Sequence, residues 1–115
     1  MIGPARSLKA KDKNRLAVGR LTIDKDRHEA TLGSYTIRLT PIESALLWRL
    51  ASEPGRVFGR EELLANVWGH GITVEHRTVD THMSKVRRKL RERPDGPSLI
   101  ETIWGMGYRL RISDP

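Results

Sequence analysis

Cations and hydroxyl groups gather on one side of the segment 77–90, and their chemistry suits a partner that carries phosphates. At helical spacing the outward residues are Arg77, Thr78, Thr81, Ser84, Lys85 and Arg88. Guanidinium and ammonium groups bind phosphate, and hydroxyl groups contact phosphate oxygens or base edges. A helix with this side exposed could lie in a nucleic-acid groove. An ordinary solvated helix face explains the segment, taken alone, equally well.

The other side of the same segment is apolar. Four residues recur at the spacing i, i+4, i+7 and i+11: Val79, Met83, Val86 and Leu90. This stripe predicts one amphipathic helix, from about residue 75 to residue 91, that buries the stripe in a core. His82 borders the stripe, which suits either a packed ring or a contact with phosphate. Lys89 lies nearer to a flank than Arg88, and Arg87 lies beside Asp80, where an internal ion pair would compete with DNA.

Positive charge is concentrated in two parts of the 115-residue chain, whose net charge is +7. Residues 77–93 hold seven basic and two acidic residues, and residues 1–15 hold five basic and one acidic residue. Residues 16–76 have a net charge of −1. A basic helix on a near-neutral body is typical of a nucleic-acid-binding protein. A membrane-surface helix would instead need large apolar residues and no globular domain around it.

The side chains that enzymes and metal sites need are missing or wrongly spaced. The chain has no cysteine, and its four histidines lack metal-ligand spacing. No glycine loop of the phosphate-binding type and no acidic phosphoacceptor pocket is visible. We therefore expect no enzyme activity, no catalytic residue, no metal and no cofactor. Without a long apolar run, a cytoplasmic protein that does not span a membrane is expected.

Segments whose pattern predicts β-strands lie on both sides of a central helical region. Residues 1–14 are typical of a flexible basic tail or linker, and residues 15–113 are expected to form one domain. Short alternations at 16–18, 21–23, 29–32 and 35–39, with Gly33-Ser34 as a two-residue turn, predict an antiparallel sheet of three or four strands. Residues 99–104 and 108–112 predict a terminal β-hairpin that turns at residues 105–107.

Two further helices are predicted between these stretches. Thr40-Pro41-Ile42-Glu43 begins the first, because Thr40 can cap it, Pro41 fits its first position and Glu43 completes a capping box. This helix is expected to reach about Ser52. The second begins after Gly59, and its expected inner face consists of Leu63, Leu64, Val67 and Trp68. The aromatic residues expected to be core rather than ligand platforms are Trp48, Trp68 and Tyr108.

Four motifs, in order and spacing, resemble one protein family. They are Leu39-Thr40-Pro41-Ile42-Glu43, Arg60-Glu61-Glu62-Leu63-Leu64 with Val67-Trp68-Gly69, Arg77-Thr78-Val79-Asp80-Thr81-His82, and Gly105-Met106-Gly107-Tyr108-Arg109. Over residues 16–112 the chain resembles the OmpR/PhoB-type effector domain of bacterial two-component response regulators. The resemblance implies an α+β fold, a winged helix-turn-helix with an N-terminal antiparallel sheet, three helices and a C-terminal β-hairpin wing.

The resemblance also implies a function, which is sequence-specific binding to double-stranded promoter DNA. In the family the third helix enters the major groove and the wing touches the neighbouring minor groove. In the helix the expected DNA-binding residues are Arg77, Thr78, Thr81, His82, Ser84, Lys85, Arg88 and Lys89. In the wing they are Thr102, Trp104 and Arg109, with Arg111 as a further polar candidate.

Protein partners follow from the same resemblance. In the family the loop before the third helix contacts RNA polymerase, and here it comprises Gly69, His70, Gly71, Ile72, Thr73, Val74 and Glu75. Family members pair head to tail on repeats about one helical turn apart. We therefore expect a weak head-to-tail dimer on DNA and a largely monomeric domain without it.

Two positions depart from the family pattern. Gly59 stands where many members have a serine that caps the second helix, which predicts only a small loss of stability. Trp104 stands where some members have an arginine that reaches into the minor groove. An indole cannot supply that charge. It either packs against a sugar or lies inside the domain.

Two other functions are open at this stage. A nonspecific or RNA-binding module would share the basic charge, although no paired exposed aromatic residues of the kind that stack single-stranded bases are evident. A protein-interaction module would use residues 69–76 to bind a partner, and its DNA binding would be incidental.

Overall fold

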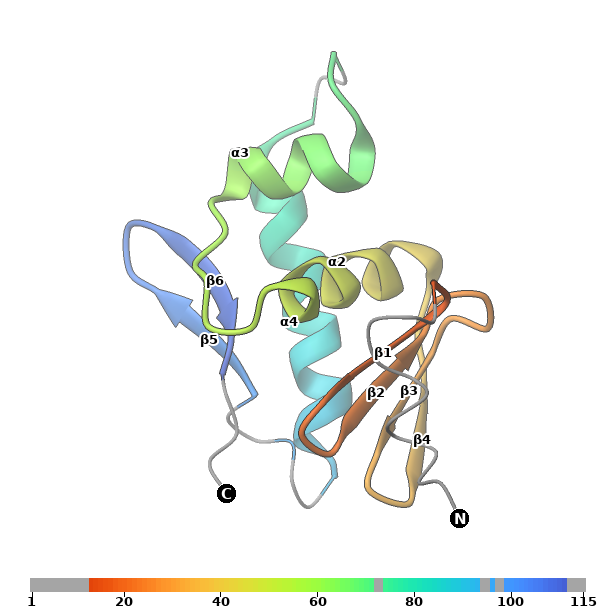
Figure 1. Ribbon diagram of the computed structural model, residues 1–115. Coiled ribbons are helices and arrows are strands. Elements are labelled where there is room, and N and C mark those ends of the chain that lie inside the picture. Colours follow the sequence, from red (N-terminus) through yellow and green to blue (C-terminus); the bar gives the residue numbers. More distant parts are fainter. Residues whose placement is uncertain (1–12, 72–73, 94–95, 97–98, 112–115) are drawn as a thin grey trace.

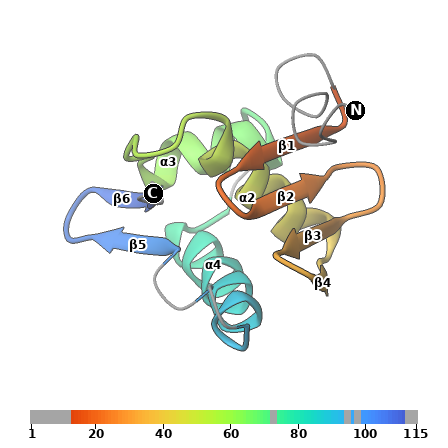
Figure 2. The ribbon, with the colours of Figure 1, turned by 60° about the horizontal axis from the view of Figure 1, so that its bottom comes forward.

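A four-stranded sheet and a two-stranded hairpin lie on opposite sides of a helical centre in the computed structural model (Figures 1 and 2). The structure describes residues 13–71, 74–93, 96 and 99–111. The elements in chain order are β1 (Arg15–Val18), β2 (Leu21–Asp24), β3 (Glu29–Leu32), β4 (Tyr35–Arg38), α2 (Pro41–Ser52), α3 (Arg60–Leu63), η1 (Leu64–Trp68), α4 (His76–Arg91), β5 (Ile100–Ile103) and β6 (Gly107–Leu110). The predicted winged helix-turn-helix architecture is confirmed.

The N-terminal sheet is antiparallel, with the strand order β1-β2-β3-β4. Leu21 pairs with Leu32, and Ala30 pairs with both Ile23 and Ile37. All five of these side chains are buried, so one face of the sheet covers the core and the other faces solvent. The predicted Gly33-Ser34 turn joins β3 to β4. The predicted tail falls largely outside the described residues, of which only 13 and 14 precede β1.

Helix α2 begins where the sequence predicts. The Glu43 amide donates to Thr40 Oγ1 at 3.1 Å, and the Thr40 amide donates to Glu43 Oε1 at 2.9 Å, which completes the capping box. Leu46, Leu47 and Leu50 are fully buried, and α2 contacts the sheet, α4 and β6. It is therefore the element around which the core is built. Among the described residues, no helix has the length and apolarity needed to cross a membrane.

The second helix differs from the regular helix that the sequence predicts. A single α-turn, α3, runs directly into the π-turn η1, because the Gly69 amide donates back to Leu64 O at 3.1 Å. Leu63 is fully buried as expected. The rest of the predicted inner face and the Trp48 ring pack against the core while staying half-buried. The two indoles are thus at the edge of the core, not inside it.

The hairpin turn lies one residue earlier than predicted. Residues 104–106 form the turn, and Gly107 is already part of β6, paired with Ile103. Phe58 exchanges two backbone hydrogen bonds with Tyr108, at 2.8 and 3.0 Å, and this bridge brings the chain against Gly107. A Cβ on Gly107 would lie 1.9 Å from the Phe58 carbonyl oxygen, and its φ is +148°. Position 107 of strand β6 therefore requires a glycine.

We predict that Gly107→Ala destabilises the domain by about 2–4 kcal/mol, because the new methyl group meets backbone that cannot move away. Gly105→Ala is the matched control. Its φ is also positive, +74°, but nothing lies within 4 Å of its Cβ position, so we expect a cost of about 1 kcal/mol. Urea unfolding of both variants measures the difference. Equal losses would show that the Phe58 contact does not constrain Gly107.

Candidate nucleic-acid interface

Helix α4 buries one side and exposes the other, as its sequence predicts. Val79, Met83, Val86 and Leu90 are fully buried. The exposed residues opposite them are Arg77, Thr81, Ser84, Lys85, Arg88 and Arg91. This surface, which we call the α4 outer face, includes Arg91, which the sequence reasoning missed. The spacing of Arg91 from Arg77 and Arg88, i+14 and i+3, could have revealed it.

Between these sides, one flank of α4 faces the wing. Asp80 Oδ1 accepts two hydrogen bonds, from Arg60 Nε of α3 at 2.7 Å and from the Tyr108 hydroxyl of β6 at 2.6 Å. Arg87 donates to Thr102 Oγ1 of β5 at 2.6 Å. The expected ion pair between Arg87 and Asp80 is therefore wrong. The two residues share a flank but lie two turns apart, about 10 Å along the axis, and each has a nearer partner.

The opposite flank of α4 faces the sheet and the other helices. Lys89 Nζ donates to Glu43 Oε1 at 2.6 Å and to the Arg38 carbonyl at 3.1 Å. His82 Nδ1 donates to the Thr78 carbonyl at 2.9 Å, and its ring forms a T-shaped contact with the Trp68 ring, with 5.6 Å between the ring centroids. Lys89 and His82 thus have partners within the domain. For His82 this agrees with the first of the two interpretations of its sequence position, a ring packed within the domain.

One ionised carboxylate lies at each flank of α4, Asp80 on the side of the wing and Glu43 of α2 on the other side. Burial disfavours the charged form of Asp80, but the hydrogen bonds from Tyr108 and Arg60 outweigh it and lower the pKa of Asp80. Burial also opposes ionisation of Glu43, which is 1% exposed, but Lys89 and the Thr40 amide lower its pKa. Burial and the hydrogen bond to Asp80 raise the pKa of Tyr108 to about 12. These groups stay in one charge state around neutral pH.

The wing residues that the sequence singled out separate onto different surfaces. Thr102 pairs in register with Tyr108, and both side chains bond to α4. Arg109 pairs with Glu101 in the next register position, so it lies on the other face of the hairpin, where its Nε donates to Glu101 Oε1 at 2.7 Å. The structure therefore does not bring Arg109 to the α4 outer face.

Trp104 lies at the tip of the hairpin and is 93% exposed. Of the two places that the sequence allowed for this indole, the interior of the domain is therefore wrong.

The loop before α4 is described only in part. His70, Gly71 and Glu75 are exposed and Val74 is half-buried, while Ile72 and Thr73 lie outside the described residues. Glu75 is the N-cap of α4, with no capping hydrogen bond from its side chain. The described residues of this loop are thus accessible for contact with a protein.

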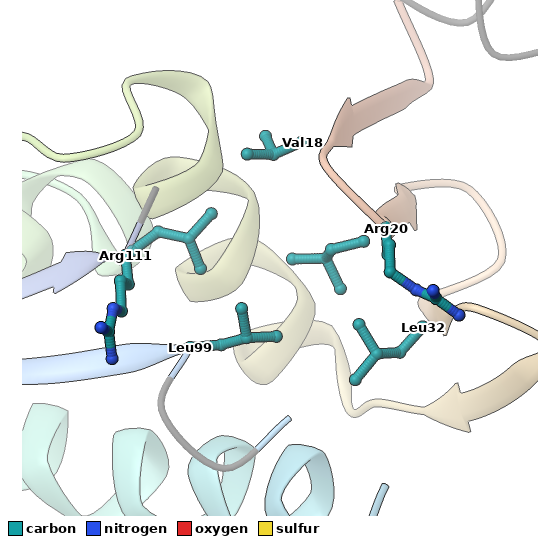
Figure 3. A pocket seen from close by; sticks show the side chains of 7 residues that line it. Val18, Arg20, Leu32, Leu99 and Arg111 are labelled. Atoms are coloured by element: carbon teal, nitrogen blue, oxygen red, sulfur yellow. The ribbon is translucent and has the colours of Figure 1, made fainter. Parts of the chain in front are cut away.

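A cavity of about 130 Å³ lies between the β1–β2 turn and the C-terminal hairpin (Figure 3). Its seven lining residues are aliphatic side chains and two arginines, Arg20 and Arg111, on opposite sides. Arg111 thus lines this cavity and not the α4 outer face. The cavity lining offers neither a nucleophile nor a carboxylate. Within the described part of the chain, no group of three or more His, Asp or Glu side chains could hold a metal.

Comparisons with known proteins show that this chain is similar to transcriptional regulatory proteins. The family described as transcriptional regulatory protein, C terminal, matches residues 34–110. The regulatory protein ResD of Bacillus subtilis is 41% identical over 101 residues, which cover 87% of this chain and 42% of ResD. The chain thus spans about two fifths of the length of this relative.

Solved structures agree with this similarity. The DNA-binding domain of CpxR from E. coli has a TM-score of 0.73 and 36% identity, covering 87% of this chain and 98% of that domain. The DNA-binding domain of RstA from Klebsiella pneumoniae, solved in complex with the RstA box, has a TM-score of 0.70 and 31% identity, covering 84% of this chain and 96% of that one.

We predict that Asp80→Asn lowers the free energy of unfolding by about 1–2 kcal/mol at neutral pH, because the charge-assisted bonds to Tyr108 and Arg60 weaken. The folded-state pKa of Asp80 is lowered from 3.8, so its stabilisation is complete above pH 3.8 and disappears as the pH falls through the folded value. The difference between the two proteins should therefore shrink below about pH 4.

Denaturant unfolding between pH 3 and pH 7 measures this difference, with Glu61→Gln as the control, since the Glu61 side chain is 87% exposed. A difference that stays constant across this range would contradict the role given to the Asp80 charge.

Proposed function

Because this chain belongs to the OmpR/PhoB family of transcriptional regulatory C-terminal domains, we propose that it binds double-stranded promoter DNA with α4 in the major groove. The family is one of DNA-binding regulators and not a class of enzymes. The observation that carries the proposal is the α4 outer face. Arg77, Lys85 and Arg88 are exposed there and have no ion-pair partner among the described residues.

The α4 outer face supplies two kinds of DNA contact. Arg88 lies midway between the two flanks, toward the C-terminal end of the helix, and is suited to a bidentate contact with a guanine edge, which a lysine cannot make. Arg77 and Lys85 suit phosphates, which fix the position of the helix without reading sequence. The small hydroxyl side chains of Thr81 and Ser84 let the helix approach the base edges. Thr81 Oγ1 donates to the Arg77 carbonyl at 3.0 Å, which leaves its methyl group and lone pairs available to DNA.

Five of the DNA-binding residues expected from the sequence take a different part in this proposal. Lys89 and His82 are bonded within the domain, and Arg109 is paired on the far face of the hairpin. We assign them to positioning α4 and the wing, not to touching DNA. Thr78 shares this assignment, because it is half-buried and its carbonyl accepts from His82. Thr102 accepts a hydrogen bond from Arg87 and so orients the wing. In this proposal the wing would lie near the neighbouring minor groove.

Further partners would act through other surfaces. The loop at residues 69–75 would contact RNA polymerase, since His70, Gly71 and Glu75 are exposed beside the start of α4. Two copies would pair weakly, head to tail, on repeated sites one helical turn apart. A longer regulator in the bacterial cytoplasm, of the size of the relatives, would carry this domain as its effector.

Two neighbouring cations on α4 provide the test. We predict that Arg88→Ala weakens binding to a duplex selected from random sequences by about ten-fold or more, and reduces the preference for that duplex over an unrelated one, because the contact with a guanine edge is lost. Its unfolding should be unchanged. Lys89→Ala should keep that preference but lose about 1–2 kcal/mol of stability, because it leaves the buried Glu43 carboxylate without its cation.

Fluorescence anisotropy on the selected and the unrelated duplex, with urea unfolding of each variant, separates the two residues. A wild-type protein that binds every duplex equally would rule out sequence-specific recognition. Equal losses of affinity in both variants, with no change in stability, would show that Lys89 and Arg88 face DNA alike.

A further inference from the structure

The turn of the wing carries two exposed apolar side chains, at positions separated by one glycine. Trp104 is 93% exposed and Met106 is 61% exposed. Among the described residues, Tyr35, at 43%, is the remaining large hydrophobic side chain with high exposure. Single exposed apolar residues are ordinary on protein surfaces. Trp104 and Met106 are both in one hairpin turn and both lie largely in water, so a partner that covers them would bury apolar surface.

The tip is held rigidly relative to α4. The Tyr108 hydroxyl bonds to Asp80, Thr102 accepts from Arg87, and the Met106 amide donates to the Ile103 carbonyl at 2.9 Å across the turn. These contacts fix both strands of the hairpin and the turn itself. A surface that meets the α4 outer face along its length therefore also comes within reach of the tip.

The tip is also uncharged. Residues 102–108 contain neither an acidic nor a basic side chain. Such a surface has no electrostatic attraction for phosphates, and the apolar parts of a duplex are the faces of its deoxyribose rings and bases. An indole offers a flat, rigid surface that packs well against such rings. A positively charged tip would instead gain from the negative potential of a narrow minor groove.

We propose that Trp104 and Met106 form an apolar wing tip that packs against the deoxyribose rings of the duplex that α4 contacts. This inference rests on the proposed function. It gives the wing contact a property that the helix contact lacks: it displaces no counterions, so its contribution to affinity does not depend on salt concentration. The alternative occupant of the tip, a second copy of the chain, is an outcome of the test.

The experiment measures affinity for a duplex with a single site, over a salt series. Trp104→Ala should bind about ten-fold more weakly, with the slope of log K against log salt unchanged and the unfolding midpoint unchanged, because the indole touches little of the domain. Trp104→Arg should recover affinity at low salt, with a slope steeper by about 0.9. Tyr35→Ala, which removes an exposed aromatic ring from the sheet, is the matched control and should bind like the wild type.

Indole fluorescence gives a second readout. Adding the duplex should change the emission of the wild type, and Trp104→Phe should lose that change while keeping most of the affinity. The inference is overturned if Trp104→Ala binds the single site like the wild type, or if its slope falls by about 0.9, as the loss of a phosphate contact would make it fall. It is also overturned if Trp104→Ala loses affinity only on duplexes with two sites, which would assign the tip to a second copy. Failure of the wild type to bind any duplex would instead contradict the proposed function.

Discussion

The arrangement of α4 and the wing depends on one carboxylate. Asp80 projects from α4 and accepts hydrogen bonds from Arg60 of α3 and from Tyr108 of β6, so a single oxygen joins the helix, the helix before it and the wing. The half-buried site makes these bonds stronger than they would be in water. The backbone bridge between Phe58 and Tyr108 holds the same strand from the other side. The wing is therefore positioned by α4 and by the segment before α3.

The cations of α4 differ in whether they have a partner within the domain. Lys89 and Arg87, on its two flanks, donate to the domain, and they fix the rotation of the helix about its axis. Arg77, Lys85 and Arg88 lie between the flanks and have no ion pair among the described residues. Cations without an ion pair on an exposed face keep their attraction for phosphates, whereas the Glu43 carboxylate largely offsets that of Lys89. Arg87 keeps its charge, but its hydrogen bond to Thr102 directs it toward the wing. Net charge alone does not separate these two groups.

Local patterns in the sequence were enough to predict most of the fold, but not the pairing of its charges. The Thr40–Glu43 capping box and the stripe from Val79 to Leu90 depend on spacing within one helix, and both are confirmed. Lys89 meets Glu43, and Asp80 meets Arg60 and Tyr108, only because separate helices and strands pack together. These residues are 20 to 46 positions apart. No periodicity records such contacts, and so Arg87 was paired with the wrong partner.

Mapping backbone and indole NMR shifts onto the sequence, as a duplex selected from random sequences is added, tests the central claim most directly. The account predicts that the largest shifts occur on the α4 outer face, at Arg77, Thr81, Ser84, Lys85 and Arg88, and at the Trp104 indole N–H. The Lys89 and Arg109 amides should change less. Shifts confined to the loop at residues 69–75, with none on α4, would contradict the account and favour a protein-interaction module.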